Sequence, residues 1–134
     1  DQLALALPLI LGISRWGCLF AHCCYGSSYH GPLAIIDHGQ EYFPAPLLES
    51  AFHLAFFFVI LRMTRTAVFS GQRLRIYLSS YAVFRFASEY LRPSSKDILG
   101  LSIYQWLSAL LLIIIAVTVI RERKKMPIAG FEEQ

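Results

Sequence analysis

Hydrophobic residues run in four long stretches along this chain, and short polar or charged segments separate them. The stretches cover about residues 3–22, 44–63, 74–91 and 101–120. A helix that crosses the hydrocarbon core of a bilayer needs roughly 20 mainly apolar residues. The pattern therefore predicts an all-α fold, a polytopic membrane helical bundle with about four transmembrane helices. Residues 1–125 would form this single domain, and residues 126–134 would form a tail.

Composition favours a membrane protein over the alternative of a very apolar soluble helical protein. Of the 134 residues, 56% are hydrophobic and only 16% are charged, whereas about a quarter of the residues in soluble domains are charged. The net charge is +3, and many of the Lys and Arg residues lie in two segments, 62–75 and 121–125, beside apolar stretches. A nucleic-acid-binding protein needs a continuous basic surface, so we expect no nucleic-acid partner.

The basic segments also predict the orientation of the helices. Cytoplasmic loops of membrane proteins carry an excess of Lys and Arg, so we place 62–75 and the carboxy-terminal tail in the cytoplasm. The loops 25–43 and 93–100 would then lie outside, and between them they hold a single Lys or Arg, Lys96. All three connections agree with this assignment.

Polar residues that are unusual in a membrane converge on the outer half of the predicted bundle. They are Arg15, Cys18, His22, Cys23, Cys24, Glu49, Arg85, Glu89, Arg92 and Gln105. His53 lies only one helical turn below Glu49. An ionisable group is costly in hydrocarbon, so such groups face the bundle interior or an aqueous cavity and usually mark a functional site.

The third stretch carries four of these positions on one helical face. Tyr81, Arg85, Glu89 and Arg92 follow one another at offsets of four, four and three, which align side chains along a helix. One interpretation is a structural Arg85–Glu89 ion pair that orders the bundle. The other is a site for a lipid phosphate, whose oxygens a guanidinium group binds bidentately.

The first stretch places a histidine near three cysteines. Offsets of three and four would put Arg15, Cys18 and His22 on one helical face, and a histidine beside a thiol can activate it as a nucleophile. Buried cysteines are also common as small apolar packing residues, so both interpretations stay open. We expect no metal, because the spacing is not a standard zinc pattern and vicinal cysteines chelate poorly. Three closely spaced cysteines also indicate no disulfide framework.

Four motifs occur in order along the chain. They are Arg15-x-Gly17, Pro44-Ala45-Pro46-Leu47-Leu48-Glu49, the set Tyr81, Arg85, Glu89 and Arg92, and Gly100-Leu101-Ser102-Ile103-Tyr104-Gln105-Trp106-Leu107-Ser108. Together they resemble the bacterial prolipoprotein diacylglyceryl transferase family over about residues 12–120. Cys18 and Cys23 replace the Asn and Glu of the family signature, so the chain resembles a divergent Cys-Cys-Tyr-Gly branch. The amino-terminal half of the family, with its His-Gly motif, is not matched, so we expect a carboxy-terminal portion.

The resemblance implies a membrane transferase that moves a diacylglyceryl group from a phosphatidylglycerol-like phospholipid to the lipobox cysteine thiol of a prolipoprotein. It also implies a multi-pass protein of the bacterial cytoplasmic (inner) membrane, and no cofactor is expected. The residues expected to be catalytic are Arg15, Tyr81, Arg85 and Cys23. The residues expected to bind substrate are Cys18, His22, Glu49, Glu89, Arg92 and Gln105.

Two alternatives keep the fold and change the function. In the first, Cys23 or Cys24 is itself acylated or exchanges thiols, because cysteine stands where the family signature has glutamate. In the second, the chain is a non-catalytic lipid-binding membrane subunit, because the family's amino-terminal half is not matched.

Overall fold

The described part of the chain folds into four α-helices, one short 3-10 turn and a small β-hairpin. The computed structural model describes residues 2–66, 69–93 and 99–125, with the backbone alone for Lys125. The elements are α1 (Gln2–Phe20), β1 (Ile35–Asp37), β2 (Gln40–Tyr42), α2 (Ala45–Arg65), α3 (Arg73–Ser88), η1 (Glu89–Leu91) and α4 (Ile103–Lys125). The expected tail at 126–134 and Lys96 lie outside the described residues. The four helices confirm the predicted all-α membrane bundle.

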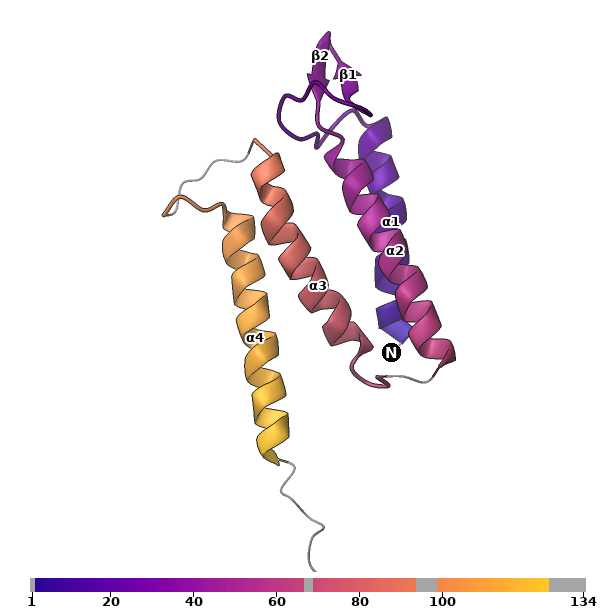
Figure 1. The fold of residues 1–134 in the computed structure, drawn as a ribbon, viewed down its shortest axis with the longest axis vertical. Helices are drawn as coiled ribbons and strands as arrows, with labels where there is room; N and C mark the ends of the chain where they lie inside the picture. Colours follow the sequence, from indigo (N-terminus) through magenta and orange to yellow (C-terminus); the bar gives the residue numbers. More distant parts are fainter. Residues whose placement is uncertain (1, 67–68, 94–98, 126–134) are drawn as a thin grey trace, which may run out of the picture.

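The helices run up and down beside one another (Figure 1). α1 packs along α2, and α3 lies between this pair and α4. The start of α1, the end of α2, the start of α3 and the end of α4 all lie at one end of the bundle. The two basic segments flank this end, which agrees with the alternating directions predicted from the loops. The hairpin lies at the opposite end, together with the end of α1, the start of α2, the end of α3 and the start of α4.

Three of the helices, α1, α2 and α4, are long and apolar enough to cross a membrane. α3 has 16 residues and is therefore about 24 Å long, a little short of a hydrocarbon core of about 30 Å. The η1 turn extends it to Leu91. Large apolar side chains on the long helices are exposed, for example Ile10, Phe58 and Ile113, as expected where lipid replaces water around the bundle.

The contact between α1 and α2 depends on a glycine. A Cβ atom on Gly12 would lie 3.1 Å from the Leu54 side chain, so the two backbones approach closely there. At the same level the Ser50 hydroxyl donates a 2.9 Å hydrogen bond to the Gly12 carbonyl. Small residues and hydroxyl bonds of this kind join helices in membranes, and they fix α2 at the correct height for Glu49 to reach α1.

The all-α prediction misses one element, a two-stranded hairpin inside the predicted outer loop. Ile35 pairs with Tyr42 and Asp37 with Gln40. The two residues between the strands, His38 and Gly39, have φ angles of 47° and 79°. Positive φ at both central positions defines the type I′ turn, which matches the twist of paired strands. The short strands give a weak periodicity, so the hydrophobic pattern alone does not indicate them.

The segment after α1 connects other parts of the chain at the hairpin end of the bundle. Gly26 donates its N–H to the Phe43 carbonyl at 2.8 Å, and Ser27 donates to the Leu91 carbonyl at 2.9 Å. The residue before α2 and the last residue of η1 are thereby hydrogen-bonded to the same segment. A Cβ atom on Gly26 would lie 2.7 Å from both the Leu91 carbonyl oxygen and the Phe43 Cβ. The segment can approach this closely because residue 26 has no side chain.

We expect Gly26→Ala to lower the free energy of unfolding by about 1–3 kcal/mol, the usual cost of overpacking. The added methyl group would meet backbone, which cannot rotate away. Gly17→Ala is the matched control, because a Cβ there meets nothing within 4 Å and alanine favours helix over glycine. Denaturation in detergent micelles, followed by circular dichroism, measures both variants. Equal stability of the two variants would contradict the expectation.

Candidate functional site

The carboxy-terminal end of α1 differs from its prediction and thereby changes the position of His22. The helix was expected to run to residue 22, but it ends at Phe20. The Cys23 N–H bonds to the Cys18 carbonyl and the His22 N–H to the Leu19 carbonyl, with His22 at φ 50°. These bonds form a Schellman motif. The expectation that His22 shares a helical face with Arg15 and Cys18 is therefore wrong.

Glu49 is the centre of the polar cluster. It lies on the second turn of α2, and its side chain is only 1% exposed. Arg15 Nε lies 2.6 Å from Glu49 Oε2, and Arg92 Nη2 donates to Glu49 Oε1 at 2.6 Å. Arg85 Nη1 is further away, at 3.9 Å. One carboxylate thus joins three arginines that come from α1, from α3 and from the segment after η1.

Arg85 and Arg92 reach the cluster by different routes. Arg85 lies on α3, pairs with Glu89 at 2.7 Å, and places its guanidinium carbon 4.7 Å from the centre of the Tyr104 ring. This confirms the predicted Arg85–Glu89 contact. Arg92 was expected to continue the helical stripe, but α3 ends at Ser88 and Arg92 has extended backbone with φ −110° and ψ 144°. Its side chain therefore turns back to Glu49 from a loop.

The arginines share one cavity. It has a volume of about 400 Å³ and is lined by Arg15, Cys24, Tyr81, Ala82, Arg85, Arg92, Tyr104, Leu107, Ser108 and Leu111. α3 and α4 form most of its wall, and apolar residues of α4 continue it along the bundle. The cavity therefore combines a cationic end with an apolar wall, as a headgroup with attached acyl chains requires.

The charges of the cluster do not cancel. Among the described residues, three guanidinium groups (Arg15, Arg85 and Arg92) meet two carboxylates (Glu49 and Glu89), so three positive charges minus two negative charges leave one positive charge. Within a membrane an unbalanced charge is costly. One bound monoanion would balance it.

Donor capacity is also left over. Arg15 Nε and Arg85 Nη1 lie 2.6 and 2.7 Å from Glu49 Oε2 and Glu89 Oε2 and are occupied by these carboxylates. Arg92 Nε is buried and has no hydrogen bond to a described residue. Buried donors of this kind usually have a partner, often water or a ligand. The cluster therefore offers the Arg92 Nε–H group as well as net positive charge to an anion.

Gln105 has a clear structural role. Ser102 precedes α4, its backbone N–H bonds to Gln105 Oε1 at 3.0 Å, and the Gln105 N–H bonds back to the Ser102 hydroxyl at 3.3 Å. This reciprocal pair is a capping box. The amide nitrogen of Gln105 also donates to the Phe86 carbonyl at 3.4 Å. Both the oxygen and the nitrogen of the side-chain amide thus form hydrogen bonds that position α4 against α3. Substrate binding by Gln105 stays a prediction.

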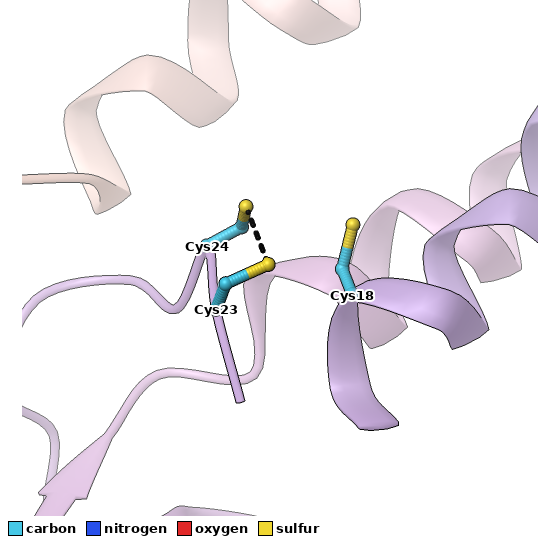
Figure 2. Close-up of side chains that lie close together, drawn as sticks. All are labelled: Cys18, Cys23 and Cys24. Atoms are coloured by element: carbon cyan, nitrogen blue, oxygen red, sulfur yellow. Dashed lines mark hydrogen bonds between the residues drawn. The ribbon is translucent and has the colours of Figure 1, made fainter. Parts of the chain in front are cut away.

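The three thiols gather at the end of α1 (Figure 2). Their sulfur atoms all lie within 4.8 Å of one another, because the Schellman motif folds Cys23 back over Cys18. Hydrogen bonding with Cys24 and partial desolvation raise the pKa of Cys23 to about 11. A raised pKa opposes the thiolate that a nucleophile needs. The ring of His22 contacts Tyr25 and Asp37. Catalysis by Cys23 and substrate binding by Cys18 and His22 stay predictions.

The fold and the site define an integral-membrane protein that gathers arginines in a cavity near one end of its bundle. The sequence matches the family described as prolipoprotein diacylglyceryl transferase over residues 1–121. The chain therefore belongs to the prolipoprotein diacylglyceryl transferase family, as its motifs predicted. No solved structure matches it significantly.

Three curated bacterial relatives are similar to most of this chain. Phosphatidylglycerol–prolipoprotein diacylglyceryl transferase of Dehalococcoides mccartyi is 33% identical over 136 residues, covering 92% of this chain and 52% of the relative. The Staphylococcus aureus (strain Newman) protein of that name is 31% identical, covering 92% and 48%. Phosphatidylglycerol–prolipoprotein diacylglyceryl transferase 2 of Clostridium perfringens is 30% identical, covering 84% and 47%. The chain spans about half the length of these relatives.

Proposed function

We propose that this chain forms the phospholipid-binding part of an enzyme that transfers a diacylglyceryl group from phosphatidylglycerol to the cysteine thiol of a prolipoprotein. The observation that carries the proposal is the cavity where Arg15, Arg85 and Arg92 meet with one positive charge in excess. The phosphodiester of phosphatidylglycerol carries one negative charge and would balance it. The names of the relatives supply the donor and the acceptor.

The chemistry gives each part of the cluster a role. The acceptor thiol sulfur attacks the diacylglyceryl carbon that is bonded to a phosphate oxygen, the carbon–oxygen bond breaks, and glycerol phosphate leaves with the bonding electrons. A base takes the thiol proton. Negative charge grows on the leaving phosphate, so positioned guanidinium groups lower the barrier. The arginines would hold this phosphate, and Tyr81, which lines the same cavity, would hydrogen-bond the headgroup.

Glu49 and Glu89 would orient the arginines rather than contact lipid. Both carboxylates are 1% exposed and lie behind the guanidinium groups. Held in this way, each arginine loses little side-chain entropy when a phosphate binds, which is the benefit of preorganisation. The nearer carboxylate partner of Arg85, Glu89, lies four residues further along the chain, in η1.

The same proposal places the site near the outer face of the bacterial inner membrane, with the carboxy terminus in the cytoplasm. The basic segments 62–75 and 121–125 flank the end of the bundle opposite to the hairpin, and the positive-inside rule assigns that end to the cytoplasm. A secreted prolipoprotein would then meet the site on the side to which it is exported.

Transfer can be measured directly with the intact native gene product in membranes. Phosphatidylglycerol labelled in its diacylglyceryl group is incubated with a lipobox peptide, and labelled peptide is expected. The same peptide with its cysteine replaced by serine is the control and should stay unlabelled. Absence of transfer by the intact gene product would overturn the substrate assignment. Lipid that copurifies without turnover would support a lipid-binding subunit instead.

A further inference from the structure

The three thiols at the end of α1 form a cluster to which the transfer step proposed above assigns no role. Cys18 lies in the last turn of the helix, and Cys23 and Cys24 follow the Schellman motif. The Cys23 and Cys24 sulfurs are 3.1 Å apart, and all three lie within 4.8 Å of one another. Backbone bonds from Cys23 to Cys18 and from His22 to Leu19 hold the turn in place. The cluster is therefore built by the fold and not by chance contacts of flexible side chains.

The spacing of the sulfurs matches the size of a bound metal ion. Metal–thiolate bonds are about 2.3 Å long for zinc, and three such bonds arranged in a plane would put the sulfurs about 4 Å apart. The Cys23–Cys24 separation of 3.1 Å is shorter than this value, and all three sulfurs lie within 4.8 Å of one another. Small rotations about the Cys side-chain bonds would thus complete the site without moving the backbone. All three cysteines are free in this structure.

The donor set selects the kind of metal. Thiolate ligands favour soft ions such as Cu(I) over hard ions such as Mg²⁺ or Ca²⁺. Zinc sites almost always have four ligands, or three with water in an open position. In the described part of the chain the cluster contains three cysteines and no fourth Cys, His, Asp or Glu. An all-sulfur set of three suits Cu(I), which accepts three-coordination.

The surroundings favour the negative charge of such a complex. Three thiolates and one Cu(I) carry two net negative charges. Arg15 interacts with Cys18, and Cys24 lines the cavity that contains Arg85 and Arg92. These nearby guanidinium groups would stabilise part of the charge that the thiolates bring. The sequence analysis expects no metal, and that expectation stays untested; the turn after α1 brings a vicinal pair of cysteines close to a third cysteine.

We infer that Cys18, Cys23 and Cys24 form a three-coordinate binding site for a soft, thiophilic metal ion, Cu(I). The site lies at the edge of the arginine cavity. The inference concerns metal binding alone and does not rest on the proposed transferase activity.

The test uses the full chain in detergent micelles, without oxygen and with a non-thiol reductant. Cu(I) is titrated in competition with bicinchoninate, a coloured Cu(I) chelator. We expect one Cu(I) per chain, and loss of this stoichiometric binding in each of Cys18→Ser, Cys23→Ser and Cys24→Ser. Ser28→Ala, an exposed position in the same segment, is the matched control and should bind one Cu(I). A parallel titration with Zn²⁺ should show weaker binding.

X-ray absorption at the copper edge of the wild-type protein tests the ligands without any variant. Three sulfur neighbours are expected. Absence of stoichiometric Cu(I) binding would overturn the inference, as would nitrogen or oxygen neighbours at copper. Stoichiometric Cu(I) binding that survives in each of the three serine variants would also overturn it. Tighter binding of Zn²⁺ than of Cu(I) would reject the assignment to copper.

Discussion

Replacing Glu49 with glutamine is expected to destabilise this protein by roughly 3–5 kcal/mol, the usual cost of removing one partner from a buried ion pair. Glu49 is 1% exposed and contacts Arg15 and Arg92 at 2.6 Å. Glutamine has nearly the same shape, so packing should change little. The loss would come from two guanidinium groups that keep their charge and no longer have a carboxylate beside them.

The measurement is denaturation of the variant and the wild type in the same micelles, followed by circular dichroism. Glu122→Gln is the matched control. Glu122 pairs with Arg75 near the other end of the bundle, and both side chains are at least one-third exposed, so water can replace this ion pair and stability should hardly change. If Glu49→Gln is as stable as Glu122→Gln, the central role of Glu49 in the cluster is refuted.

The sequence predicts most of the helical framework, because lipid imposes a simple rule on helix length. The predicted stretch 44–63 corresponds to α2, Ala45–Arg65, and the stretch 74–91 corresponds to α3 with η1. The errors lie at helix ends, where hydrophobicity is no guide. α4 begins after the Ser102 cap and continues to Lys125, since Arg, Glu and Lys are good helix formers and extend the helix past its apolar part.

The sequence predicts which residues form the arginine–glutamate cluster, but it predicts their arrangement only in part. The cost of charge in hydrocarbon predicts that Arg15, Glu49 and Arg85 converge, and the structure brings them together. The centre of the cluster is not predicted, because Arg92 reaches Glu49 from extended backbone and not from a helix. The thiol cluster is also missed. It depends on a left-handed residue at His22, and a non-glycine residue gives no clear sequence signal for this conformation.

Arg85→Lys is expected to lower kcat/KM for diacylglyceryl transfer by about 10²–10³-fold, as when one positioned donor to a developing charge is lost. Lysine keeps the positive charge but has no planar fork for bidentate contact with phosphate. It also loses the stacking of the guanidinium over Tyr104, where the carbon-to-centroid distance is 4.7 Å. The assay is the labelled-lipid transfer to a lipobox peptide, with the intact native gene product carrying the substitution.

Arg75→Lys is the control for the same chemical change on the same helix. Arg75 lies near the start of α3 and pairs with Glu122, far along the helix from Arg85, so its replacement should leave kcat/KM unchanged. The comparison separates the two interpretations of the Arg85–Glu89 pair. A purely structural pair requires that Arg85→Lys leave the transfer rate of the folded protein intact, because lysine can still neutralise Glu89, the partner of Arg85. A phosphate site requires a lower transfer rate in the folded variant, because lysine cannot hold two phosphate oxygens at once. Wild-type kcat/KM in folded Arg85→Lys would therefore remove Arg85 from the proposed phosphate site.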